Sequence, residues 1–403
     1  METQKSSNAK IGIYLSAILM MGVIGVSSSL STIGAHFPKL DQTAITNLIS
    51  VPCLVVIPVT LIAGKLMEYI AKKALVITGI VLFILGGVLP AFLNDFTAIL
   101  IMRGLFGVGI GLIQVLCSAL VAENYDGAAR DKVMGTMNSF QMLGCAGMSL
   151  IGGYLGSLGW NIVFFVHLLG IISLIAASVY IPYQKPLGKT ITNTSAKPQV
   201  TITSACIGWI IFMFIFFIGG QIFSNSVSFL VTELHIGSAA EAGLTLTFFA
   251  CGGFIMGFIF GKINATLRNV TMSFGFLMLA VSYLIMALSG NIIAIFLGAL
   301  ICGLAFSICM PCIMVGAANS VNAASVGMAI AITTCSQNLG MTLCPYVVNP
   351  VSKALSQAVR LNTNQMAIIL GAVLIGAFGV IFLIRGIIQN NKENLNMGES
   401  KLA

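Results

Sequence analysis

Apolar runs of about twenty residues recur along the whole chain, and they limit the folds that it can adopt. As α-helices, runs of this length cross the roughly 30 Å hydrocarbon layer of a bilayer. Only 7% of the 403 residues are charged, against roughly 25% in an average soluble domain. The sequence therefore predicts twelve membrane-spanning runs, at 11–35, 44–67, 74–94, 97–122, 133–156, 160–182, 204–231, 239–262, 270–289, 291–318, 324–350 and 364–388.

These runs predict helices because a spanning segment must satisfy its own backbone hydrogen bonds, and the alternation typical of barrel strands is absent. The first run is too long for a cleavable signal, so we expect it to be retained. Fifteen Lys and Arg residues fall on one side of the predicted bundle and three on the other, namely Lys39, Lys353 and Arg360. The positive-inside rule then places both termini in the cytoplasm of a multi-pass cell-membrane protein.

The remaining composition excludes several classes of protein. The formal charge of +8 is a topology signal, and no folded basic reader that would bind nucleic acid is evident. The ten cysteines lie within apolar runs without paired spacing, which favours reduced packing residues. Three scattered histidines and no deep acids make an enzyme improbable, and we expect no metal and no cofactor.

The chain also contains an internal repeat. Gly64-Lys65 recurs as Gly261-Lys262 at an offset of 197, and the sequence QMLG from Gln141 recurs as QNLG from Gln337 at an offset of 196. Matching offsets predict two parallel six-helix bundles, residues 1–182 and 204–403, joined by a cytoplasmic linker at 183–203.

These features resemble the major facilitator superfamily, and within it the twelve-helix drug:proton antiporter group. The loop GKLMEYIAKK is similar to the family's motif after its second span, which implies a cytoplasmic latch between the two halves. Glu68 stands for the motif's acid, while Tyr69 and Ala71 depart from the pattern. A carboxylate there favours a helix amino terminus. The predicted latch comprises Gly64, Leu66, Glu68, Lys72 and Lys73.

Glycine motifs carry the rest of the resemblance. In the fourth span RGLFGVG is similar to the antiporter motif Arg-x-x-x-Gly-x-Gly, and the fifth-span GCAGMSLIGG keeps part of an exporter motif, with Met148 and Ser149 where Gly and Pro are expected. Small residues in these positions let helices approach closely. We expect this packing role for Gly107, Gly109, Gly111, Gly144, Gly152 and Gly153.

Arg103 is the one charged residue between Phe96 and Ala122, and His167 is the buried group whose unperturbed pKa lies near neutral. A charge within a span is by default a functional-site hypothesis; the alternative is that Arg103 hydrogen-bonds carbonyls and hydroxyls of spans one and five. His167 is either a proton-coupling group or a packing residue. Polar neutral residues that could orient a substrate near the midplane, or join helices instead, are Ser28, Gln114, Asn138, Gln141, Gln221, Asn225 and Gln337.

We therefore expect a monomeric secondary transporter that works by rocker-switch alternating access, with a small-molecule substrate and membrane lipids as its partners. The resemblance favours efflux of amphipathic or drug-like compounds, with proton antiport as the candidate driving force. Uptake or exchange of a small organic anion that binds Arg103 is the alternative, since no deep carboxylate pairs with this residue. A transporter-derived receptor or scaffold is the alternative from another class.

Overall fold

Helices account for the secondary structure of the part of the chain that the structure describes. This computed structural model describes residues 2–125, 127–183, 202–322, 325–359 and 361–402, so most of the predicted linker lies outside the described residues. The first half contains α1 (Glu2–Ala17), η1 (Ile18–Met21), α2 (Ile24–Ser27), α3 (Leu30–His36), α4 (Gln42–Tyr69), α5 (Lys72–Val88), η2 (Leu89–Phe92), α6 (Phe96–Asn124), α7 (Gly127–Leu158), η3 (Ile162–Leu169) and α8 (Gly170–Tyr180). The second half contains α9 (Ser204–Glu233), α10 (Ala239–Leu267), η4 (Arg268–Val270), α11 (Thr271–Leu288), α12 (Ile292–Asn319), α13 (Val326–Val359) and α14 (Thr363–Leu402).

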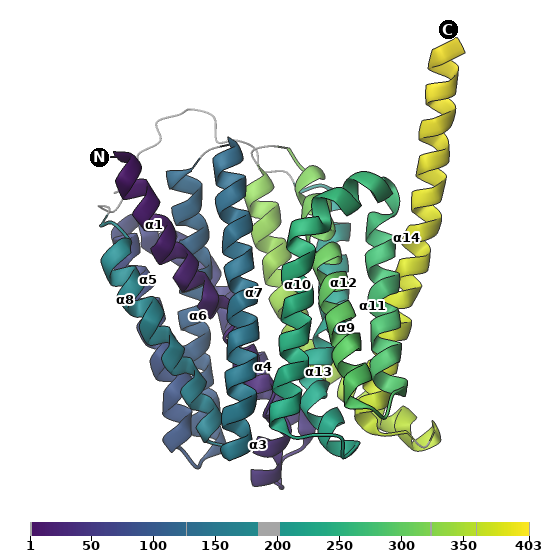
Figure 1. The fold of residues 1–403 in the computed structure, drawn as a ribbon. Coiled ribbons are helices and arrows are strands. Elements are labelled where there is room, and N and C mark those ends of the chain that lie inside the picture. The colour runs from purple at the N-terminus through teal and green to yellow at the C-terminus, as the bar shows by residue number, and fades with distance from the viewer. Residues whose placement is uncertain (1, 126, 184–201, 323–324, 360, 403) are drawn as a thin grey trace.

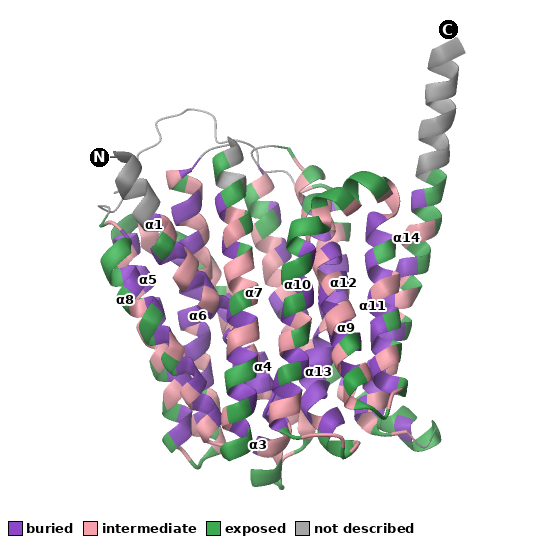
Figure 2. Cartoon of the chain, viewed as in Figure 1, coloured by how far each residue is buried: buried purple, intermediate pink, exposed green. Residues whose placement is uncertain are grey.

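Nine stretches of the described chain are long and apolar enough to cross a membrane, and one of them contains both α10 and α11. The long helices α7 and α13 complete a set of twelve, each matching one predicted run. Exposed apolar side chains cover the outer faces of the bundle, while buried ones lie between helices (Figure 2). The expectation of an all-helical membrane protein with twelve spans is confirmed.

Local sequence signals explain where several spans begin. Asp41 and Asp95 cap α4 and α6 by accepting hydrogen bonds from the backbone amides of Ala44 (2.7 Å) and Ala98 (3.0 Å). Ser238 and Glu241 form a capping box at the start of α10. Such caps satisfy amide groups that the first helical turn leaves without partners, and they fix the loops between spans.

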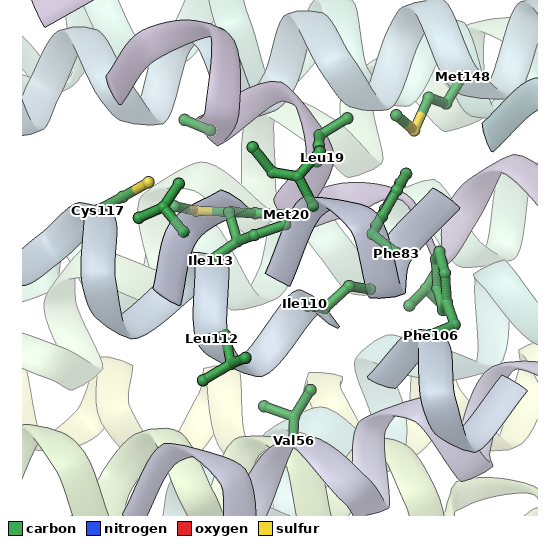
Figure 3. Close-up of a cluster of buried hydrophobic side chains, with 14 of the residues drawn as sticks. Leu19, Met20, Val56, Phe83, Phe106, Ile110, Leu112, Ile113, Cys117 and Met148 are labelled. Carbon is green, nitrogen blue, oxygen red and sulfur yellow. The ribbon is translucent and has the colours of Figure 1, made fainter. Parts of the chain in front are cut away.

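Two hydrophobic clusters form the core. One gathers buried side chains between Ile13 and Ile181, and the other gathers those between Phe212 and Ile375. In the first, Phe83 of α5 and Phe106 of α6 pack with ring centroids 4.7 Å apart (Figure 3). Each cluster is thus built from one half of the sequence, as a two-bundle organisation requires; the exact boundaries at 182 and 204 stay a prediction.

The two ends of the bundle differ. α1 begins and α14 ends at the same end, which we call the terminal end (Figure 1). The opposite, distal end contains α3 and the starts of α4 and α6. The predicted orientation places the terminal end in the cytoplasm.

The first span is broken, which its uninterrupted apolar run did not predict. α1 passes through the short 3-10 segment η1 into α2, and a second break at Ser28 and Ser29 precedes α3. In the sixth span, the 3-10 segment η3 precedes α8. Irregular backbone at membrane depth is tolerated where it is buried in protein, and it exposes carbonyl groups to partners on other helices.

Candidate functional site

Arg103 is enclosed within the first cluster. Its side chain is 0% exposed, and Nε donates a hydrogen bond to the carbonyl oxygen of Leu48 on α4 (2.8 Å). The guanidinium also lies over the ring of Phe106, 4.0 Å from its centroid. Among the described residues, Nη2 has no hydrogen-bond partner. A buried cation is therefore stabilised by one carbonyl dipole and one aromatic face.

His167 supplies a further contact to Arg103. Nδ1 of His167 lies 2.8 Å from the carbonyl oxygen of Phe164, and a carbonyl can only accept, so Nδ1 carries the proton. Nε2 is then free to accept from Nη1 of Arg103, 3.4 Å away. Gly87 of α5 makes room for this ring, because a Cβ atom there would overlap the imidazole.

These contacts place Arg103 among helices of one bundle. Its partners come from the second and sixth spans, whereas the packing alternative expected spans one and five. The reason is that α6 packs closely on α4: a Cβ atom at Gly107, one turn after Arg103, would lie 2.6 Å from the carbonyl oxygen of Pro52, one turn after Leu48. Sequence spacing could not show which span turns a carbonyl toward this residue.

A ladder of serine hydroxyls joins the two clusters at the broken first span. Ser27 and Ser224 lie 3.2 Å apart between hydroxyl oxygens, and Ser31 and Ser228 lie 2.8 Å apart. Both pairs are separated by 197 residues, the offset of the sequence repeat. Residues related by the repeat can meet only where its symmetry axis passes, so the axis runs between α2–α3 and α9. We call these four serines the distal gate.

Predicted candidates Ser28 and Asn225 are themselves related by the offset of 197. The carbonyl oxygen of Ser28 accepts a hydrogen bond from the hydroxyl of Ser228 (2.8 Å). Asn225 is buried, and its side-chain carbonyl lies 3.4 Å from the amide nitrogen of Gln221. The structure thus brings Ser28 next to the distal gate and pairs Gln221 with Asn225 on α9.

The other predicted polar residues lie apart from these. Gln114 on α6, Gln141 on α7 and Gln337 on α13 are half-buried, and Asn138 on α7 is exposed. The side-chain nitrogen of Gln141 lies 2.9 Å from the sulfur of Met20. The structure does not gather these four amides into one constellation, so their substrate role stays a prediction.

Further polar contacts between the clusters were missed at the sequence level. Between α4 and α13, Tyr346 donates to Asn47 (2.7 Å) and Asn349 donates to Thr43 (3.1 Å). Thr342 donates to the carbonyl oxygen of Ser50 (3.3 Å). The signal was present, because Thr43, Asn47 and Ser50 recur at helical spacing on one face of α4.

All these contacts lie toward the distal end. Between α7 and α10, Thr247 contacts the hydroxyl of Ser149 (3.1 Å) and the carbonyl oxygen of Ala146 (3.3 Å). Among the described residues, the inter-cluster hydrogen bonds of α4 end at Ser50, eight residues from the distal start of this helix. On α10, Thr247 is the residue that forms such bonds. The two clusters are therefore hydrogen-bonded along the distal half of their interface.

The predicted latch lies at the terminal end within the first cluster. Lys72 forms an ion pair with Glu123 at the end of α6, and Lys73 donates to the carbonyl oxygen of Ser178 (2.7 Å). Gly64 and Glu68 are exposed, and Leu66 is half-buried. In this arrangement, the two lysines contact their own bundle.

Close helix approach is observed at the predicted packing glycines. A Cβ atom at Gly107 would lie 2.6 Å from the carbonyl oxygen of Pro52, one at Gly109 equally near Gly79, and one at Gly111 2.8 Å from Val59. Added Cβ atoms at Gly144 and Gly152 would overlap carbonyl oxygens of the first span, and Gly153 approaches Gly243 across the two clusters. Such contact between backbones requires residues without side chains.

Comparison with known proteins decides the family. The model of the Major Facilitator Superfamily matches residues 11–345 and 209–396. The chain belongs to the major facilitator superfamily. It is therefore a multi-pass membrane transporter and not an enzyme, and the expected major facilitator fold is confirmed.

Similar members of the superfamily differ in their named substrates. Multidrug transporter protein MdtP of Bacillus subtilis (strain 168) is 30% identical over 116 residues, 28% of this chain and 21% of MdtP. Riboflavin transporter RibZ of Clostridioides difficile (strain 630) is 23% identical over 198 residues, 49% of this chain and 42% of RibZ. Each match spans less than half of the relative, so neither match shows which substrate this chain has.

Solved structures show the same fold over more than nine tenths of the chain. The nucleoside transporter NupG superposes with a TM-score of 0.76 at 12% identity, covering 94% of this chain and 99% of NupG. A transporter of the POT family gives a TM-score of 0.71 at 13% identity, covering 93% and 95%. At such identities, the likeness between this chain and the two solved structures shows the fold alone.

Proposed function

We propose that this transporter moves a small organic molecule by opening its two ends in turn, and that the arrangement described above is the form closed at the distal end. The observation that carries this proposal is the distribution of inter-cluster hydrogen bonds, which occupy the distal half of the interface. With the predicted orientation, the terminal end opens to the cytoplasm. Serine pairs on the symmetry axis suit a gate, because neutral hydroxyls exchange partners at little cost.

For the substrate, we propose export of amphipathic or drug-like compounds, with proton antiport as the driving force. The similarity to MdtP supports this choice, and so does an apolar cavity between α4, α9 and α13. The test is flux of such compounds in proteoliposomes with and without a pH gradient. An export rate that is the same with and without the pH gradient would remove proton antiport from the proposal. The absence of flux for every compound in a broad panel would favour the receptor or scaffold alternative.

Uptake or exchange of an organic anion is the second candidate, because Nη2 of Arg103 has no hydrogen-bond partner among described residues. Thermal stabilisation of purified protein by anion and drug panels separates the two candidates. Anion stabilisation that disappears in Arg103→Ala would favour the second candidate. Stabilisation by lipophilic compounds that survives in Arg103→Ala would favour export.

The gate itself is tested by a cross-link. Because the hydroxyl oxygens of Ser31 and Ser228 lie 2.8 Å apart, Ser31→Cys with Ser228→Cys brings two sulfurs within reach of a disulfide bond of about 2 Å. Oxidation should stop flux, reduction should restore it, and each single variant should remain active. Flux that continues with the disulfide formed would show that the distal end does not need to open.

A further inference from the structure

An apolar cavity of about 640 Å³ lies between α4, α9 and α13, on the terminal side of the hydrogen-bonded half of the interface. Its walls include Leu54 and Ile57 of α4, Ile211 of α9, and Cys335 and Leu339 of α13. The volume falls within the range of roughly 300–1,000 Å³ that is typical of small-molecule sites.

The cavity lies along the same face of α4 that contacts α13 nearer the distal end. From the distal end inward, Thr43, Asn47 and Ser50 meet successive polar partners on α13. The next residues on the same face of α4 are Leu54 and Ile57, and both line the cavity. Along one helix face, the interface therefore changes from hydrogen-bonded to apolar and open.

The internal repeat explains why space is left here. Ile211 corresponds to Tyr14, and Ser336 to Phe140, at offsets of 197 and 196. Tyr14 and Phe140 stack on each other with ring centroids 5.1 Å apart. Smaller residues thus line the cavity at the positions where two stacked rings fill the repeat-related site.

A third position follows the same pattern. Ile57 corresponds to Phe254 at the offset of 197, and Leu54 corresponds to Cys251. At these three positions the cavity has smaller side chains than the equivalent positions, although Phe214, which also lines the cavity, corresponds to the smaller Ala17. The backbone differs as well, since α9 continues where α1 ends at Ala17 and passes into η1.

The walls offer no charge and no free strong hydrogen-bonding group among the side chains that line the cavity. The hydroxyl of Ser336 donates to the carbonyl oxygen of Ile210 (2.7 Å), which leaves the half-buried thiol of Cys335 as the weakly polar exception. A charged ligand would lose its hydration here without compensation. Leu54, Ile211 and Leu339 are 47%, 53% and 39% exposed, so the cavity opens onto the apolar surface of the bundle.

We propose that this cavity binds the aromatic part of uncharged lipophilic compounds, which reach it from the hydrocarbon layer. The ligand's rings take the place that the stacked rings of Tyr14 and Phe140 occupy in the repeat-related site. This inference rests on the proposed function, because it names the substrate class and its route of entry.

Cys335 provides the test in the full-length protein. In nanodiscs, N-ethylmaleimide modification of each cysteine is followed by mass spectrometry, with and without the uncharged fluorophore N-phenyl-1-naphthylamine. At about ten times its Kd, the probe should slow modification of Cys335 about tenfold. The exposed Cys251, at the position equivalent to Leu54, should react at an unchanged rate. Equal slowing of both cysteines, or of neither, would overturn the proposal.

Variants that exchange the two sites supply the controls. Ile57→Phe and Ile211→Tyr introduce the rings of the repeat-related site, and each should abolish protection of Cys335 while the melting temperature is retained. Phe254→Ile makes the reverse change outside the cavity and should leave protection intact. Protection that survives both filling variants would contradict the assignment.

Two further readouts separate the alternatives. If membrane lipid fills the cavity, modification of Cys335 without probe will be slower in nanodiscs than in detergent and the probe will have no effect, which overturns the proposal. Flux measured in parallel separates this inference from the proposed function. Flux without protection overturns the cavity assignment alone, whereas protection without any flux overturns transport and leaves the binding site.

Discussion

Replacing His167 by Leu tests whether its ring stabilises the buried charge of Arg103. His167→Leu removes the acceptor of Nη1 and leaves the guanidinium with the carbonyl of Leu48 and the ring of Phe106. Interhelical hydrogen bonds in membranes average about 0.6 kcal/mol and reach about 1.7. Bonds to charged groups contribute about 1.5–3 kcal/mol. Because the distance of 3.4 Å is long, we expect a loss of about 1.5 kcal/mol.

A double-mutant cycle isolates this contribution. Arg103→Met removes the buried cation, after which His167→Leu should cost less than about 0.5 kcal/mol, so the coupling free energy is about 1 kcal/mol. The assay is equilibrium unfolding of purified protein in mixed micelles with increasing dodecyl sulfate. Additive losses would refute the reasoning, because they would mean that the imidazole stabilises the bundle without sensing the charge.

Two further predictions concern helix approach and the latch. Gly144→Leu should destabilise the protein by about 1–3 kcal/mol or prevent folding, since its side chain meets the backbone of Ile18, whereas Gly147→Leu, where an added Cβ has open space, should change the melting temperature little. Comparable losses in both variants would contradict this account. Glu68→Gln, an exposed change, should alter stability by less than about 0.5 kcal/mol yet raise N-ethylmaleimide modification of Cys335 by favouring the form open at the terminal end. An unchanged rate would count against a latch role for Glu68.

The sequence alone predicted the twelve spans, but not the breaks within the first of them. Membrane spans follow from composition, because lipid leaves a polar backbone no partner outside its own helix. The repeat offset of 197, found between Gly64-Lys65 and Gly261-Lys262, reappears as the separation of Ser27 from Ser224. The length of an apolar run and the offset of a repeat can be read from the sequence without knowing which helices are in contact.

Tertiary structure decided the partners and the spaces between helices. Arg103 contacts His167 and Leu48 of the sixth and second spans, and no periodicity in an apolar run shows which helices will meet there. The end at which the inter-cluster hydrogen bonds gather, and the cavity beside Cys335, likewise depend on how the two clusters meet. A sequence lists side-chain sizes, but only the packing of helices shows that Leu54 and Ile57 border an open space.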